Sequence, residues 1–125
     1  MFKNYNANPK GKKVADCVIR AISTAIGESW QDVYRDMVDH SIKECTVFND
    51  KKFIKKYITN VLGLEMQKQP RFTNGKKLTV SDFATWYDSG TYIITIANHL
   101  TVIKDGIILD TWNCENKCVG NYWKV

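Results

Sequence analysis

The sequence lacks several features that would place the chain in a membrane or divide it into several domains. Among its 125 residues, no apolar stretch approaches the roughly 20 residues that a membrane helix needs. The first ten residues contain no apolar core of the kind found in a signal peptide. Only two prolines occur, and no repeat or low-complexity linker interrupts the chain. The sequence therefore predicts a single domain over residues 1–125 that works in the cytoplasm and has no membrane partner.

Residues suited to metal binding are few, with four cysteines and two histidines in the chain. In a reducing cytosol the cysteines are expected to remain thiols rather than to form a disulfide framework. Cys114 and Cys118 lie close in the sequence, but they are separated by three residues rather than the two typical of zinc fingers, and no second pair follows. We therefore expect no metal and no cofactor, and thiols packed in or near the core.

Positive charge exceeds negative charge, with 18 lysines and arginines against 13 acidic residues and a net charge of +5. Lys51, Lys52, Lys55 and Lys56 gather in one short segment. Two interpretations of this segment stay open. The lysines fit the solvated face of a helix whose other face is apolar, and they also permit contact with an anionic ligand or an acidic partner.

The apolar pattern changes along the chain from helical to strand-like. Residues 1–15 are polar and look irregular. The periodicity then predicts helices over residues 17–26 (between an Asp16 cap and Gly27), from a Ser29 cap to between residues 40 and 45, over 50–62, and over 79–87. β-Branched and aromatic residues predict strands over 91–96, 100–103, 107–112 and 122–125. This order indicates an α+β fold, with N-terminal helices packed on one face of a C-terminal antiparallel sheet.

Cys17 occupies the first turn of the predicted helix over residues 17–26. The partial positive charge and the free N–H groups at a helix start favour a thiolate over a thiol. The same N–H groups can bind an oxyanion that forms beside the sulfur. Cys17 is therefore a candidate nucleophile, although a cysteine in such a position also serves as a small core residue.

The side chains of His99 and Asp110 are predicted to meet across a hairpin. Asp105-Gly106 is a strong signal for a two-residue turn, and such a turn pairs Thr101 with Asp110. Directly paired residues and alternate residues of one strand share a sheet face, so His99 becomes a diagonal neighbour of Asp110. Asp110 lies in an apolar segment, where an unpaired carboxylate is costly to bury, and His99 is the partner in range. In the same register Trp112 lies opposite His99 and is expected to wall the site.

Two segments, residues 16–22 and 99–112, resemble the papain-like superfamily of cysteine peptidases. Within it they most resemble small uncharacterised proteins of phages and prophages of Gram-positive bacteria, and more distantly the double-glycine leader peptidases of bacteriocin exporters. The resemblance covers residues 8–112 and implies a papain-like fold with a triad of Cys17, His99 and Asp110. Such enzymes usually place a glutamine shortly before the nucleophile to complete the oxyanion hole. No glutamine stands there, and Asn8 and Asn6 offer the nearest side-chain amides.

These features lead to two hypotheses about function. The first is a phage-encoded cysteine hydrolase that cleaves an amide, isopeptide or thioester bond in a peptide or protein substrate through an acyl-enzyme. The second is a non-catalytic binding module on the same fold, which inhibits a host defence protein or sequesters a nucleotide through its basic surface. Substitution of Cys17 by alanine separates the two, because only the first requires the sulfur.

Overall fold

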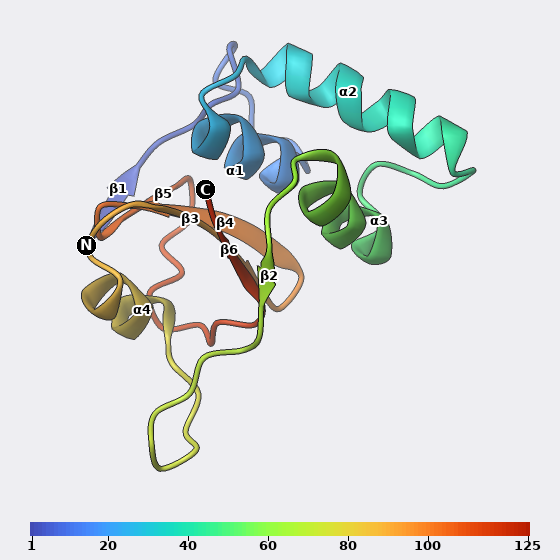
Figure 1. Ribbon diagram of the computed structural model, residues 1–125. Coiled ribbons are helices and arrows are strands. Elements are labelled where there is room, and N and C mark those ends of the chain that lie inside the picture. The colour runs from blue at the N-terminus through green and yellow to red at the C-terminus, as the bar shows by residue number, and fades with distance from the viewer.

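The computed structural model describes all 125 residues, and it combines four α-helices with one six-stranded sheet (Figure 1). An α+β arrangement is therefore confirmed. The elements follow one another as β1 (Phe2–Asn4), α1 (Cys17–Ile26), α2 (Trp30–Lys43), α3 (Lys51–Lys56), the π-helical segment η1 (Tyr57–Val61), β2 (Met66–Gln67), α4 (Val80–Trp86), β3 (Thr91–Ile96), β4 (His99–Lys104), β5 (Ile107–Asp110) and β6 (Tyr122–Lys124).

The helices begin and end close to where the sequence predicts. Ser29, Asp50 and Thr79 each accept a hydrogen bond from the backbone N–H three residues on, which caps α2, α3 and α4. Gly27 ends α1 in the left-handed conformation, with a φ of 73°, which glycine adopts at little steric cost. The helix predicted over residues 50–62 is α3 continued by η1, so its second half is π-helical rather than α-helical.

The central strands form the hairpin register that the sequence predicts. Asp105 and Gly106 both have positive φ values, 49° and 76°, as a tight two-residue turn requires. The antiparallel pairing of β4 with β5 then sets Ile103 opposite Ile108 and Val102 opposite Leu109. The strand predicted over residues 107–112 is shorter than expected, since β5 ends at Asp110.

The sheet is mixed, so the expectation of a purely antiparallel sheet is wrong at one edge. The strand order is β1-β5-β4-β3-β6-β2, and β1 pairs with β5 in parallel. The sequence reading of residues 1–15 as irregular missed β1, and it also missed β2. These strands have three and two residues, too few to show an alternating pattern, and they form because each neighbouring strand leaves an edge open to pairing.

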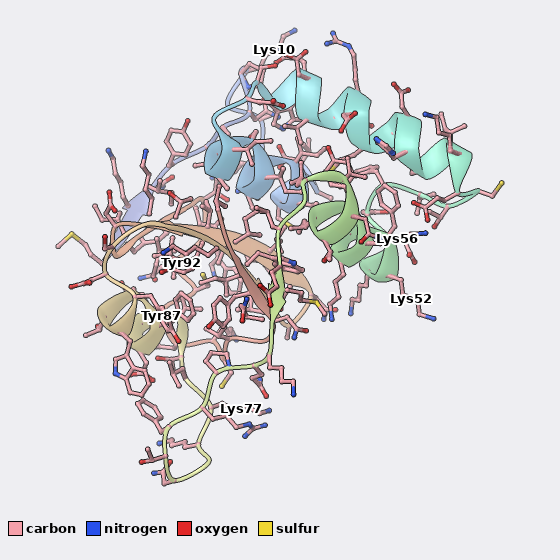
Figure 2. All side chains as sticks on the ribbon, in the orientation of Figure 1. Lys10, Lys52, Lys56, Lys77, Tyr87 and Tyr92 are labelled. Atoms are coloured by element: carbon pink, nitrogen blue, oxygen red, sulfur yellow. The ribbon has the colours of Figure 1, made fainter.

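Helices cover both faces of the sheet, whereas the sequence indicated one (Figure 1). On one face α1, α2 and α3 pack with Ile93, Leu100 and Trp123 in the larger core cluster. On the other face α4 packs over the alternate strand residues. There Tyr92 of β3 meets Tyr87, which follows α4, with ring centroids 5.5 Å apart (Figure 2). The strands alternate apolar residues to both sides, so the sheet is a buried layer between two cores.

Candidate active site

Cys17 is half-buried at the first position of α1, as the sequence predicts. Asp16 precedes it at the capping position, but its carboxylate makes no hydrogen bond to a helix N–H. The predicted position of the cap is therefore confirmed, but the expected hydrogen bond from its side chain is not made. Arg20 N–H bonds the Asp16 carbonyl, whereas the N–H groups of Cys17 and Val18 have no acceptor in the chain. The positive end of α1 is thus left open beside the sulfur.

The Asp16 carboxylate is used inside the protein, where its side chain is only 3% exposed. One oxygen accepts a hydrogen bond from Arg20 Nε at 2.8 Å. The other accepts from Trp30 Nε1 at 3.0 Å and from Asn8 Nδ2 at 3.3 Å. Burial makes these charged and polar partners more valuable to the carboxylate than a helix cap, because an unpaired buried charge is costly.

His99 and Asp110 meet as the hairpin register predicts. His99 Nε2 lies 2.6 Å from Asp110 Oδ2, in a hydrogen bond between two largely buried side chains. The Trp112 ring packs edge-on against the imidazole with a centroid distance of 5.0 Å, so Trp112 walls His99 although it lies beyond the end of β5. Burial opposes ionisation of Asp110, but the hydrogen bond from His99 and its positive charge outweigh this and lower the pKa of the carboxyl.

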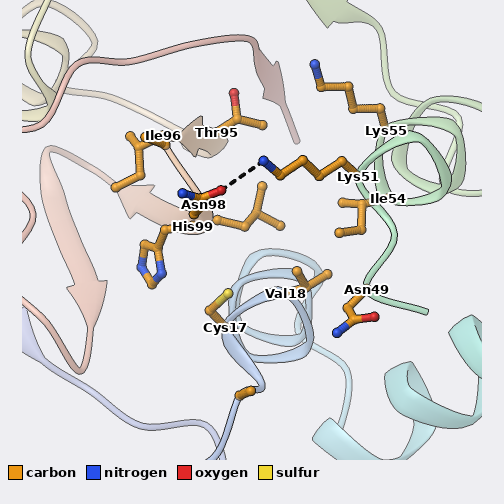
Figure 3. A pocket seen from close by; sticks show the side chains of 13 residues that line it. Cys17, Val18, Asn49, Lys51, Ile54, Lys55, Thr95, Ile96, Asn98 and His99 are labelled. Atoms are coloured by element: carbon orange, nitrogen blue, oxygen red, sulfur yellow. Dashed lines mark hydrogen bonds between the residues drawn. The ribbon is translucent and has the colours of Figure 1, made fainter. Parts of the chain in front are cut away.

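The sulfur and the imidazole converge at the N-terminal end of α1 (Figure 3). Burial opposes ionisation of Cys17, but the neighbouring His99 imidazole, the Leu100 N–H and the positive charges of His99 and Arg20 lower the pKa of the thiol. Burial likewise opposes the charge on His99, and its hydrogen bond to Asp110 together with the nearby Cys17 sulfur raises the imidazole pKa to about 9. The two shifts together favour the ion pair of a thiolate and an imidazolium over the neutral thiol and imidazole.

Arg20 connects the two buried carboxylates of the site, and the sequence reading overlooked it. Its Nη1 donates to Asp110 Oδ1 at 3.2 Å and to Thr111 Oγ1 at 3.1 Å, while its Nε bonds Asp16. Asp110 therefore has one oxygen held by Arg20 and the other aimed at His99. A sequence signal for this role exists, because Arg20 is the one charged residue in a largely apolar helix.

Asn8 and Asn6, the amides proposed for the oxyanion hole, are engaged elsewhere. Asn8 is buried, its Nδ2 bonds Asp16, and its Oδ1 accepts from the backbone N–H of Lys10. Asn6 donates to the Lys12 carbonyl and accepts from the Asn8 N–H. Neither residue lines the cleft beside Cys17. Both amides shape the loop before α1, and the structure does not bring them to the sulfur.

A cleft of about 490 Å³ opens beside Cys17 and His99. Its 13 lining residues come from the start of α1 and from α3, with one loop residue before each, and from the adjoining ends of β3 and β4 with their turn. Lys51, Lys55 and Asn98 are among them (Figure 3). Asn98 belongs to the two-residue turn before β4 and has a φ of 57°, so strand alternation does not govern where it points.

The remaining cysteines lie outside this cleft. All four cysteines are free thiols, with Cys114 buried and both Cys45 and Cys118 exposed. Burial raises the pKa of Cys114 to about 11. No group of three or more His, Cys, Asp or Glu side chains gathers as a metal site. None of the helices combines the length and apolar character needed to cross a membrane.

Comparison with known proteins adds no assignment to this geometry. The chain matches no family model, no curated protein and no solved structure.

Proposed function

We propose that the chain is a papain-like cysteine hydrolase that cleaves an amide, isopeptide or thioester bond. One observation carries the proposal: the half-buried Cys17, at the start of a helix, lies beside His99. The imidazole of His99 is in turn held by Asp110, with Nε2 2.6 Å from Oδ2. The order of these residues in the chain, and a helix packed on antiparallel strands, support a papain-like arrangement. The adjoining cleft offers a place for the substrate.

The proposed reaction begins with the Cys17 thiolate attacking the substrate carbonyl carbon. The carbonyl oxygen becomes an oxyanion, and His99 transfers its proton to the leaving amine or thiolate as the carbon–nitrogen or carbon–sulfur bond breaks. A water molecule then attacks the acyl-enzyme and gives its proton to His99. The carboxylic acid product leaves and the thiolate is regenerated. Asp110 keeps the proton of Nε2 in place, so that Nδ1 serves the reacting groups.

The oxyanion is assigned to the backbone at the start of α1. The N–H groups of Cys17 and Val18 have no acceptor, because the carboxylate of Asp16 is engaged in the interior. Free N–H groups next to a nucleophile are the usual donors to an oxyanion. This arrangement explains how the site can work without a glutamine before the nucleophile, since Asn8 and Asn6 are engaged in their own loop.

Iodoacetamide is expected to alkylate Cys17 at pH 7 about tenfold faster than the exposed Cys45 and Cys118. The thiolate is the reacting species, and His99 lowers the thiol pKa at Cys17. Mass spectrometry of peptides from the native chain, sampled over time, measures the rates. The pH profile at Cys17 should have its midpoint below the ordinary value of 9.0. Equal rates at Cys17, Cys45 and Cys118 would refute the activated thiolate.

A further inference from the structure

The cleft beside Cys17 contains two lysines and no carboxylate to balance their charge. Its lining contains Lys51 and Lys55, which we call the lysine rim, together with His99, and it contains no Asp or Glu. Lys51 and Lys55 are four residues apart within α3, so both project from the same side of that helix. Figure 3 shows them at the end of the cleft away from the sulfur and the imidazole.

The lysine rim has no carboxylate partner elsewhere in the chain. Lys51 Nζ donates to Asn98 Oδ1 at 2.8 Å and Lys55 Nζ donates to Asn121 Oδ1 at 3.2 Å, both neutral amides. Lys56, on the same helix, instead forms an ion pair with Glu44 at 2.7 Å. Lys51 and Lys55 therefore have weak partners that a carboxylate can replace, since charge-assisted hydrogen bonds are the stronger kind.

The floor of the cleft is aliphatic and fits a peptide better than a nucleotide. Val18, Ile54, Ile96 and Leu100 supply its apolar surface, and no Phe, Tyr or Trp is among the 13 lining residues. Recognition of a nucleobase usually relies on stacking against an aromatic ring or an arginine. An extended peptide needs apolar contact for one side chain and hydrogen bonds for others, which this lining provides.

We propose that the substrate is an acidic polypeptide segment, with a Glu or Asp side chain close to the scissile bond that binds Lys51 and Lys55. This inference rests on the proposed function, because it assigns the substrate class of the same cleft. The lysine rim holds the carboxylate, the aliphatic floor receives a neighbouring side chain, and the carbonyl is thereby placed at Cys17.

The charge of the cleft can be measured without knowing the natural substrate, by comparing two alkylating probes. Iodoacetate is anionic and iodoacetamide is neutral, and each reacts when the thiolate displaces iodide. The ratio of their rates at Cys17 is independent of the fraction of thiolate, because both probes use the same sulfur. We expect Lys51→Gln/Lys55→Gln to lower the iodoacetate-to-iodoacetamide ratio about five- to tenfold. In 1 M salt, where the screening length is about 3 Å, the wild-type ratio should fall toward that of the variant.

The matched control is Lys52→Gln/Lys56→Gln, which removes the same charge from the same helix outside the cleft. Figure 2 shows Lys52 extending from α3 to the side away from the sheet, and neither Lys52 nor Lys56 lines the cleft. The control should leave the ratio within about twofold of wild type. Charge reversal in Lys51→Glu/Lys55→Glu should depress iodoacetate further while sparing iodoacetamide.

A second measurement tests the peptide itself. Two peptide thioesters are compared, one with Glu and one with Gln next to the thioester. The wild type should prefer the Glu peptide about five- to tenfold in kcat/KM. The Lys51→Gln/Lys55→Gln variant should lose this preference. Fast alkylation of Cys17 with equal probe ratios in all variants, or equal turnover of both peptides, would overturn the substrate assignment and leave the hydrolase. Slow alkylation of Cys17 by both probes would refute the hydrolase itself.

Discussion

Replacing His99 with alanine is expected to slow acylation of Cys17 by p-nitrophenyl acetate at pH 7 by about 10²-fold. Without the imidazole, burial raises the thiol pKa, and only the Leu100 N–H and the charge of Arg20 lower it. A thiol with a pKa near 9 is about 1% ionised at pH 7. The measurement is the burst of p-nitrophenolate, one per chain, in a background where the exposed Cys45 and Cys118 are serine.

The pH dependence of this burst shows whether His99 lowers or raises the pKa of the Cys17 thiol. In the wild type the acylation rate should level off below pH 9, because the thiol pKa is lowered from its ordinary value of 9.0. In His99→Ala the rate should keep rising into more alkaline solution, since the Cys17 thiol then loses its proton only at higher pH. The two curves should therefore approach each other at high pH.

His40→Ala is the matched control, because His40 is the other of the two histidines in the chain. His40 lies on α2, where its Nε2 is 3.6 Å from Asp36 Oδ1, and it does not line the cleft. Its removal should leave the burst unchanged. Equal burst rates in His99→Ala and His40→Ala, or a wild type with no burst from Cys17, would contradict the role given to His99.

The contact between His99 and Asp110 could be predicted from sequence because local rules determine it. The Asp105-Gly106 turn fixes the register of β4 against β5, and the two-residue period of a strand fixes which side chains share a face. An acidic residue inside an apolar strand then needs a nearby partner. These arguments use only residues close together in the sequence, and the structure has the pair at 2.6 Å.

The meeting of Cys17 with His99 could not be derived in the same way. It depends on how α1 lies across β3, β4 and β5, which no spacing in the sequence fixes. Only the resemblance to papain-like proteins predicted that Cys17 and His99 meet. The cleft also depends on tertiary packing, because Lys51 and Lys55 line it only once α3 has packed beside the β3–β4 turn. Helix periodicity showed that these lysines leave the core, but it did not show what they face.

Asp16 has two competing local roles, and this explains why its carboxylate does not cap α1. Asp16 has the sequence position of a cap, yet its carboxylate is committed to Arg20, Trp30 and Asn8. Capping propensity is worth about 1 kcal/mol, whereas leaving a buried carboxylate or guanidinium unpaired costs several. The tertiary partners therefore decide where Asp16 points. Arg20, the single charged residue of α1, was the one indication in the sequence that Asp16 has a buried partner.

Substitution of Arg20 by glutamine is expected to lower the free energy of unfolding by about 3 kcal/mol. The side chains of Asp16 and Asp110 are 3% and 2% exposed, and Arg20 is the cation that both contact. Removing it leaves two buried carboxylates with fewer partners, although Asp110 retains His99. Urea unfolding followed by circular dichroism measures the change. Arg35→Gln is the matched control, because Arg35 pairs with Asp32 in solvent, with side chains 73% and 69% exposed, and it should cost about 0.5 kcal/mol or less.

A lysine at position 20 separates the charge of Arg20 from its shape. Arg20→Lys keeps a cation near both carboxylates, but a single ammonium cannot reproduce bonds that leave Nε and Nη1 in different directions. We expect it to recover less than half of the lost stability. The alkylation profile of Cys17 gives an independent readout, since the positive charge of Arg20 lowers the thiol pKa. Arg20→Gln should move the midpoint of that profile to higher pH, while Arg20→Lys should largely restore it. If Arg20→Gln destabilises the chain but leaves the midpoint unchanged, Arg20 supports the fold alone and does not act on the nucleophile.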